Sequence, residues 1–517
     1  MTGGIIQLAA RGAQDMFLTE NPQITFFKVV YRRHTNFSIE QVPQTFLSTP
    51  NFGKRVSCHI QRTGDLIGDM YIVVTLPKIP QLYNTNGTID NITRFAWIRK
   101  IGYGIIKQVE IEIGGQLIDR HYGEWLNIWA ELNSRNSDVD NIIGNVEQLY
   151  NFTSTKNEYK LFIPLKFWFC GISGMALPIL CLQYNDVKIN LELSDLSACH
   201  LISPTHYIEL DNNIVNFVKD EYIVQTIDST INIGRFSHFD LVTKRLYYVK
   251  ISNSPFQALN DSNFNTYSTT QQTTLINKYS LVGQTSGYMA CPFINTSTST
   301  TYNSVAYTYN THTNIRIKEC FLLVDYIFLD EEERLKFYKA NHEYIIEQLI
   351  YTGETSLDGV NRSVRVGLAN PCKLMIWVTQ LAYLQNTTNN DFYNYTNSPI
   401  YVDNSQKGDS LIKNATILFN GHSRMEQRDE IYYNCVQSQQ YFKYNLTKGI
   451  CLYSYGIDPS KKQPSGTCNM SKIDNIQISM QLTNDVSINN PVKFRCYGLV
   501  NNVLRIISGL GGIVFTK

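Results

Sequence analysis

Two short segments, FSIEQV (37–42) and YIIEQL (344–349), resemble each other and lie about 300 residues apart in a chain of 517 residues. A six-residue match can arise by chance, so the useful question is whether the segments that follow also repeat in order. They do: GDMYIVVTL (68–76) follows the first segment, and CKLMIWVTQ (372–380) follows the second. The repeat therefore extends well beyond the two hexapeptides.

Further matches keep the same order, and most of them alternate apolar and polar residues. In chain order they are KQVEIEIGG (107–115) with KNATILFNG (413–421), EWLNIW (124–129) with EIYYN (430–434), and VKINLEL (187–193) with IQISMQL (476–482). Alternation with a period of two is typical of strands that bury one face. Several such strands in each copy indicate a sandwich or barrel rather than βαβ units.

The chain is therefore predicted to be all-β, with one β-sandwich duplicated in tandem. An eight-stranded jelly roll is one architecture for such a sandwich, among several. The predicted layout, including long loop insertions, is an N-terminal arm (1–23), a first sandwich (24–329) with an insertion at about 195–314, a short linking helix (330–344) and a second sandwich (345–517).

Two helices are predicted within this pattern. Asp330 can cap the linking helix, and the glutamates that follow suit its positive N-terminal end. A second helix is predicted over 122–133. The apolar residues expected to pack are Leu335, Phe337 and Tyr338 in the first helix and Trp125, Ile128 and Trp129 in the second.

Two stretches, 253–314 and 385–404, are rich in Ser, Thr, Asn and Tyr. Their many aromatic and β-branched residues argue against disorder. Because buried polar side chains each need a partner, both stretches are expected to be ordered, exposed loops at one end of the sandwiches. They would offer accessible sites for glycans or for a binding partner.

The N-terminal segment 3–18 has apolar residues at helical spacing. They are Ile5, Leu8, Ala9, Ala13, Met16 and Phe17. An amphipathic helix is predicted here. It either packs on its own sandwich or contacts other components of an assembly.

Composition excludes several classes of protein. The net charge of +1 does not suit a protein that neutralises nucleic-acid phosphates. Eleven scattered cysteines without a CxxC pair indicate reduced thiols in a cytosolic compartment. The sequence shows no secretory signal pattern, and its apolar runs are too short for a membrane span. Only 17% of residues are charged, so much of the surface is expected to be neutral or covered by neighbours.

The sequence shows no recognisable catalytic, cofactor or metal motif. His200 and His206 lie six residues apart in a polar stretch, and a surface pair with local partners is the favoured interpretation over a ligand pair. Nucleophile-elbow and phosphate-loop patterns are absent from the sequence. No catalytic, cofactor-binding or metal-binding residue is predicted, and the chain is expected not to be an enzyme.

Longer segments carry a family resemblance across nearly the whole chain. The chain resembles the major capsid proteins of large (nucleocytoplasmic) double-stranded DNA viruses of eukaryotes, the double jelly-roll family. The segments that carry the resemblance are GGIIQLAARGAQDMFLTENPQITFFKVVYRRHTNF (3–37), GDLIGDMYIVVTLP (64–77), ALPILCLQYNDVKI (176–189), VDYIFLDEEERLKF (324–337), HEYIIEQ (342–348) and SYGIDPSKKQPSGTCNMSKID (454–474).

This resemblance implies two jelly rolls per subunit and a homotrimer that acts as a pseudo-hexameric capsomer of an icosahedral shell. It further implies contacts with neighbouring capsomers and with minor capsid and penton proteins, an inner membrane nearby, no direct contact with nucleic acid, and assembly in the host cytoplasm. A less abundant paralogue of the main coat protein is one alternative. A carbohydrate-binding or glycan-modifying sandwich is another, and it would need an aromatic groove with converging carboxylates or a buried histidine cluster.

Overall fold

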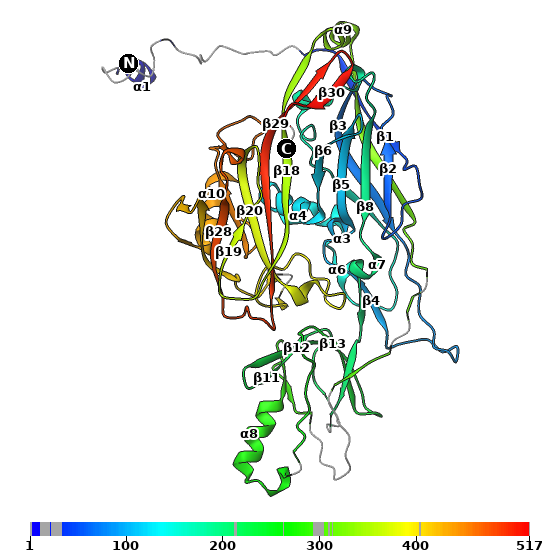
Figure 1. Cartoon of the computed structure of the whole chain (residues 1–517). Helices are drawn as coiled ribbons and strands as arrows, with labels where there is room; N and C mark the ends of the chain where they lie inside the picture. The colour runs from blue at the N-terminus through cyan, green and yellow to red at the C-terminus, as the bar shows by residue number, and fades with distance from the viewer. Residues whose placement is uncertain are drawn as a thin grey trace.

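The computed structural model describes residues 3–10, 21, 34–210, 215–261, 263–292, 304–308, 311–312, 314–402 and 405–515. Two β-sandwiches lie side by side, and a smaller sheet lies beyond one end of them (Figure 1). The chain begins with helix α1 (Gly3–Ala9), in which Ile5, Ile6 and Leu8 are exposed. The helix predicted over 3–18 is thus present in part, is exposed rather than packed on a sandwich, and lies for the rest outside the described residues.

The first sandwich consists of two four-stranded antiparallel sheets. The first has the order β1 (Phe37–Gln44), β17 (Glu319–Leu329), β3 (Leu66–Leu76) and β7 (Tyr159–Pro164). The second has the order β2 (Arg55–His59), β8 (Val187–Leu193), β5 (Ile106–Ile113) and β6 (Gln116–His121). Alternating apolar residues of both sheets fill one core between them.

The second sandwich repeats this plan. Its first sheet has the order β18 (His342–Leu357), β29 (Val492–Ile507), β20 (Pro371–Leu381) and β26 (Ile450–Ser454), with β27 (Cys468–Asn469) and β30 (Leu510–Ile513) added at the sides. Its second sheet has the order β19 (Asn361–Arg365), β28 (Ile476–Leu482), β23 (Ile412–Phe419) and β24 (His422–Ser423), with β25 (Arg428–Asp429) also on β23. Eight principal strands in each sandwich make the chain a double jelly roll, as predicted.

The predicted repeat pairs occupy corresponding places in the two strand orders. Strands β1, β3, β5 and β8 of the first roll match β18, β20, β23 and β28 of the second. The match extends to an irregularity: the β5–β8 ladder shifts register at Lys107, and the β23–β28 ladder shifts at Lys413. A shared bulge at the same place supports a common origin of the two rolls.

The hairpin after each of these strands also repeats. Gly114 and Gly115 form the turn between β5 and β6, and Asn420 and Gly421 form the turn between β23 and β24. All four residues have positive φ, which is the backbone that a two-residue hairpin with the twist of its strands requires. Gly115 and Gly421 therefore hold the same position in the two rolls.

Helix α9 (Glu331–Lys339) links the rolls, and it is shorter than predicted. The Asp330 carboxylate accepts a hydrogen bond from the Glu331 backbone N–H at 2.8 Å, as expected of a cap. The helix ends before residue 344 because the backbone from His342 onward pairs with β29, starting opposite Ile506. Leu335 and Tyr338 are exposed, so only Phe337 of the expected stripe packs on the core.

The insertion contains a sheet with a core of its own, more organised than a set of loops. Its seven antiparallel strands are, in order, β15 (Met289–Ala290), β14 (Leu281–Gly283), β11 (Tyr222–Ile227), β12 (Thr230–Asp240), β13 (Arg245–Lys250), β10 (His206–Glu209) and β16 (Val305–Ala306). Helix α8 (Thr269–Tyr279) is exposed and begins with a capping box at Ser268. The pair β4 (Arg94–Trp97) and β9 (His200–Ser203) leads into this sheet, which lies at the opposite end from α9 (Figure 1).

Short elements complete the described chain. They are α3 (Ile101–Gly104), α4 (Gly123–Asn133), α5 (Asn136–Ile143), α6 (Glu147–Tyr150), α7 (Leu196–Cys199), α10 (Gln437–Tyr441), the π-helical turn η5 (Tyr432–Val436), the 3-10 turns η1 (Ser173–Met175), η2 (Ile179–Cys181), η3 (Phe264–Thr266), η4 (Ala382–Gln385) and η6 (Met470–Lys472), and the pair β21 (Tyr401–Val402) and β22 (Ser405–Gln406). None of the helices in the described ranges has both the length and the hydropathy of a membrane span.

The repeated hairpin gives a first testable prediction. Gly421→Ala should lower the free energy of unfolding by about 1–2 kcal/mol, because an L side chain at φ near +86° is strained even though the space around it is open. Gly367→Ala is the matched control: this exposed glycine of the same roll has open space and no positive φ. Urea unfolding of both variants measures the difference. Equal stability of the two would contradict the assignment of the turn.

Candidate functional site: the seam between the two jelly rolls

Helix α4 belongs to the first roll but packs on the second, so it joins the two. Leu126 and Ala130 on one side of the helix lie in the first roll's core. Trp125, Ile128 and Trp129, predicted as core residues, lie in a separate cluster between the rolls. The residues that meet them there are outward-facing and come from the second roll: Leu349, Leu374, Ile376, Val378, Ile450, Leu452, Tyr497 and Leu499.

The members of this cluster are buried and pack against one another. Trp125 stacks on Trp129 at 5.5 Å between ring centroids and contacts Tyr497 at 5.9 Å. Leu374, Ile376 and Val378 of β20 alternate with residues of the second roll's own core, so β20 buries both of its faces. Burying an aromatic side chain stabilises a structure by about 1.5–3 kcal/mol, so the two tryptophans contribute substantially to holding the rolls together.

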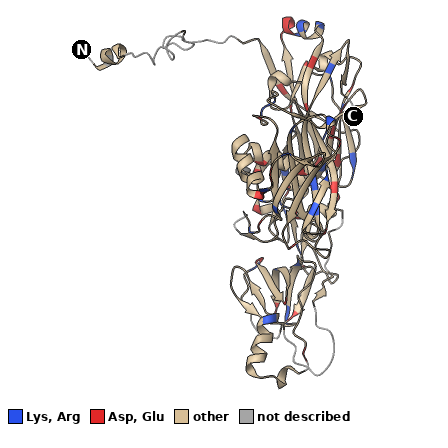
Figure 2. Ribbon diagram, turned by 60° about the vertical axis from the view of Figure 1, so that its left-hand side comes forward, with Lys and Arg blue, Asp and Glu red and all other residues tan. Residues whose placement is uncertain are grey.

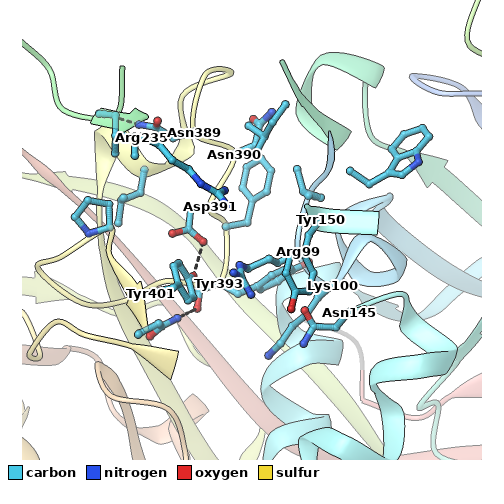
Figure 3. Close-up of a pocket in the computed structure, with 18 of the residues that line it drawn as sticks. Arg99, Lys100, Asn145, Tyr150, Arg235, Asn389, Asn390, Asp391, Tyr393 and Tyr401 are labelled. Atoms are coloured by element: carbon cyan, nitrogen blue, oxygen red, sulfur yellow. Dashed lines mark hydrogen bonds between the residues drawn. The ribbon is translucent and has the colours of Figure 1, made fainter. Parts of the chain in front are cut away.

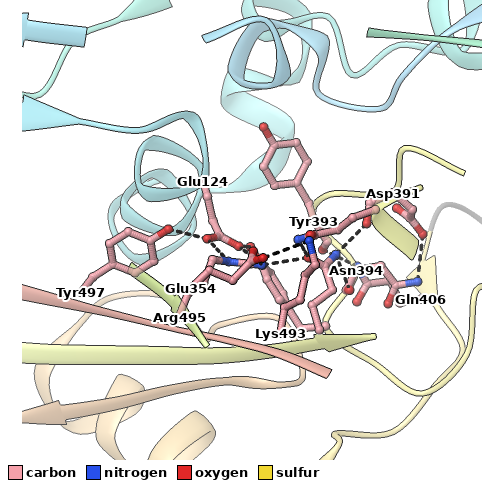
Figure 4. Close-up of polar contacts among 12 residues, drawn as sticks. Glu124, Glu354, Asp391, Tyr393, Asn394, Gln406, Lys493, Arg495 and Tyr497 are labelled. Carbon is pink, nitrogen blue, oxygen red and sulfur yellow. Dashed lines mark hydrogen bonds and ion pairs between the residues drawn. The ribbon is translucent and has the colours of Figure 1, made fainter. Parts of the chain in front are cut away.

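A buried ion pair lies beside the apolar cluster (Figure 4). The guanidinium of Arg495 on β29 donates two hydrogen bonds to the Glu124 carboxylate at the start of α4, each at 2.7 Å. Tyr395 and Tyr497 donate their hydroxyl protons to the same carboxylate. Arg495 also contacts Glu354 at 3.1 Å. Burial acts to lower the pKa of Arg495, but the attraction of Glu124 outweighs it and holds the pKa above its usual range.

Further polar contacts cross the seam along its length. At the other end of α4, the Glu131 carboxylate accepts hydrogen bonds from Lys100 of its own roll and from Thr447 of the second. Asp119 on β6 accepts a hydrogen bond from the backbone N–H of Leu349 on β18 at 2.9 Å. Gln348 donates to the Ile118 carbonyl. The seam is thus an interface with an apolar centre and a polar rim.

The stretch 385–404, expected to be an exposed loop, is buried or half-buried over 389–401, and only residues 386–388 of its described part are exposed. Asn394 and Thr396 are fully buried, and Tyr395 lies in the seam. The polar side chains have found partners: Asn394 donates to Asp391 and to the Ser398 carbonyl, and Thr396 donates to Asn394. The premise that polar residues would need partners was sound, but neighbouring backbone and side chains supply them.

A cavity of ≈ 410 Å³ lies where this stretch meets the first roll and the insertion (Figure 3). The Arg99 guanidinium lies between the rings of Tyr150 and Tyr401, 4.1 and 4.3 Å from their centroids. Tyr401 donates to the Asp391 carboxylate at 2.7 Å. Burial raises the pKa of Asp391 even though Tyr401, Asn394 and Arg99 stabilise its charged form. The polar groups here bind one another and tie three parts of the chain together.

The histidines do not gather at a common site. His200 and His206, expected to form a surface pair, are half-buried, and each ring contacts a nearby oxygen. Burial lowers the pKa of both, that of His206 to about 4, and lowers the pKa of His238 to about 4 as well. The described part of the chain holds no group of three or more His, Cys, Asp or Glu side chains placed to bind a metal ion. All eleven cysteines are free thiols.

The described chain is a double jelly roll whose two rolls meet at one internal interface. Comparisons with known proteins identify its family. Residues 25–233 match the family model of the major capsid protein N-terminus, and residues 333–512 match that of the large eukaryotic DNA virus major capsid protein. The chain belongs to the major capsid proteins of large eukaryotic DNA viruses.

Relatives cover the whole chain. It is 39% identical to the probable capsid protein 4 of Acanthamoeba polyphaga mimivirus, over 100% of this chain and 99% of the relative. It is 31% identical to the major capsid protein of Pyramimonas orientalis virus, over 100% of both chains. These relatives are structural capsid proteins rather than enzymes, which disfavours the carbohydrate-modifying alternative.

Solved structures show the same fold. The Faustovirus major capsid protein superposes with a TM-score of 0.62 at 12% identity, over 96% of this chain and 94% of that one. The PBCV-1 virus capsid subunit superposes with a TM-score of 0.60 at 24% identity, over 95% and 100%. The protein is therefore a capsid protein that forms the virion shell together with neighbouring subunits.

The ion pair of the seam gives a second prediction. Arg495→Met should destabilise the protein by about 3–5 kcal/mol, because it leaves the Glu124 carboxylate buried without its cation. Lys107→Met removes the exposed Lys107–Glu192 pair and serves as the control, with an expected loss below about 1 kcal/mol. Denaturant unfolding followed by tryptophan fluorescence compares them. Similar losses in both variants would show that the buried pair has no special role.

The half-buried His206 and His238 give a third prediction. Their pKa of about 4 lies below the ordinary value, so between about pH 6.5 and pH 4 the unfolded chain binds more protons than the folded one. Stability should therefore fall as the pH drops through this window. His206→Gln combined with His238→Gln should reduce that fall, whereas His422→Gln on the exposed strand β24 should not. Urea midpoints at about pH 7 and about pH 4.5 test this, and an unchanged pH dependence in the double variant would refute it.

Proposed function

We propose that the protein trimerises into pseudo-hexameric capsomers of an icosahedral shell. The observation that supports this most directly is the duplication. Each subunit has two rolls with the same strand order, so a trimer has six similar lobes. Six lobes match the six neighbours of a hexagonal lattice position. The domain division belongs to the same proposal: an arm (1–23), a first roll (24–329), the linking helix and a second roll that starts at His342.

The charge pattern suits a shell that does not bind the genome directly. Lysines and arginines are mixed with aspartates and glutamates over both rolls (Figure 2). The sheet of the insertion also carries both signs, with Glu209, Arg235 and Asp240 among its charged residues. The net charge is +1. A coat that wraps nucleic acid would need a basic surface or arm to neutralise phosphates. The proposal includes contacts with minor capsid and penton proteins, a membrane on the inner side of the shell, and assembly in the host cytoplasm.

The two ends of the subunit have different proposed roles. The exposed apolar residues of α1 suit contacts with neighbouring capsomers or minor proteins at the inner side. The insertion sheet and exposed helix α8, at the end opposite α9, suit the outer surface (Figure 1). Glycosylation requires an accessible asparagine in a sequon, and Asn86, in the loop between β3 and β4, is exposed. Asn394, although in a sequon, is 0% exposed and is not an acceptor in the folded chain.

The oligomeric state is the fourth prediction. The purified protein at micromolar concentration should elute as one species with a mass of about three times 59.4 kDa by light scattering. Obligate interfaces bury on the order of 2,000 Å² or more, so the trimer should survive dilution in this range. A stable monomer would overturn the proposal.

A further inference from the structure

The two rolls differ in how their equivalent outer sheet faces are covered. In the second roll, the covered face consists of Leu374, Ile376, Val378, Leu452, Tyr497 and Leu499, all buried beneath α4 of the first roll. The equivalent sheet of the first roll is β1-β17-β3-β7. Its outward side chains remain partly open in the single chain.

We call the outward residues of that sheet the open face: Phe162 is exposed, and Tyr71, Phe321 and Leu323 are half-buried around a fully buried Val73. The strand registers place them on one surface, because Val73 lies opposite both Phe321 and Phe162, and Leu323 lies opposite Tyr71. Their neighbours in the sequence, such as Ile72 and Leu322, point into the core. Phe162 is 37% exposed. The amine of Lys160 lies 5.9 Å from the Phe162 ring and 5.4 Å from the Phe321 ring, which confirms that these rings share one face.

The second roll also has an equivalent of α4, which packs on its own roll and leaves its outward side exposed. Its helical segment 430–441 includes η5 and α10 and starts nine residues after Gly421, just as Glu124 lies nine residues after Gly115. Tyr433 anchors this segment on its own core, as Leu126 anchors α4. At the positions of Trp125 and Trp129 stand Ile431 and Cys435, and both are exposed.

The outward side of this segment has an apolar part, beside the exposed Gln439 and Gln440. Ile431 is 65% exposed and Val436 is 44% exposed. Exposed apolar residues that cluster on one face are typical of interaction surfaces. The single chain therefore contains one complete interface between a helix and a sheet, made by α4. It also has a second helical segment, 430–441, and a second sheet face, the open face, that do not contact each other.

We propose that segment 430–441 of one copy docks on the open face of the next copy and repeats between subunits the seam that α4 makes within one. This rests on the proposed trimer and adds which surfaces meet. The contact is heterologous, since the helical segment of one chain meets the sheet of another. A heterologous contact that closes after three copies gives a ring. In this ring, seams between the two rolls of one chain alternate with seams between neighbouring chains.

Charged substitutions on each half test the proposal. Ile431→Asp places a carboxylate where an apolar contact is proposed, and Phe162→Glu does so on the open face. Each variant alone should be a folded monomer by light scattering, with circular dichroism and melting midpoint near those of the wild type. Ile457→Asp is the control, since Ile457 is 83% exposed in the same roll and should leave the trimer intact.

Mixing the two monomeric variants provides the decisive measurement. An Ile431→Asp chain keeps a good open face, and a Phe162→Glu chain keeps a good helical segment, so one native contact can form but the ring cannot close. The mixture should give a dimer of about twice 59.4 kDa, although neither variant dimerises alone. A trimer in either single variant, or a mixture that stays monomeric, would overturn the assignment of these surfaces. A monomeric wild-type protein would instead contradict the proposed trimer itself.

Discussion

The fold depends on how α4 is held between the two rolls. A four-stranded sheet such as β18-β29-β20-β26 has apolar side chains on both faces, and only one face is used by the second roll's own core. Without a cover, the outer face would be a large exposed apolar patch. Helix α4 supplies two tryptophans for this face and Glu124 for the single arginine beside them. Because Arg495 and Glu124 are both removed from water, each stabilises the structure only while the other is present.

The same interaction explains why duplicated sequences gave unequal rolls. After the shared hairpin, the first roll carries Trp125 and Trp129, whereas the second carries the smaller Ile431 and Cys435. Trp125 and Trp129 fill the interface between the two rolls of one chain. The smaller pair leaves a surface that can stay exposed while the chain folds and can then meet another copy. The two rolls share one strand order, and a few side chains decide whether the helix after the hairpin is buried against a sheet or left exposed.

Two stretches rich in polar residues differ in how far they are buried. In the insertion, Thr and Gln line the exposed helix α8, and several bond to backbone close by: Thr273 donates to the Thr269 carbonyl and Gln272 donates to the Phe264 carbonyl. In the stretch 385–404, similar residues are buried and satisfied by one another, as when Gln380 donates to the carbonyls of Asp391 and Asn394. Composition is nearly the same in both stretches. Whether such a segment lies inside or outside depends on which groups are near it in space, and that is a property of the assembled fold.

The sequence by itself determined the all-β class, the tandem duplication, the matched strands and the helix over 122–133, because periodicity and order are local properties that survive in one dimension. It also indicated Asp330 as a cap, since capping depends on neighbours in the chain. The end of α9, the burial of Asn394 and the half-buried state of His206 were decided only by tertiary structure. Each depends on partners far away in the chain: β29 pairs with His342, and Asn394 and Tyr395 fold into the junction between the rolls. The seam between Glu124 and Arg495 joins residues 371 positions apart, and only packing of the rolls brings two such charges together.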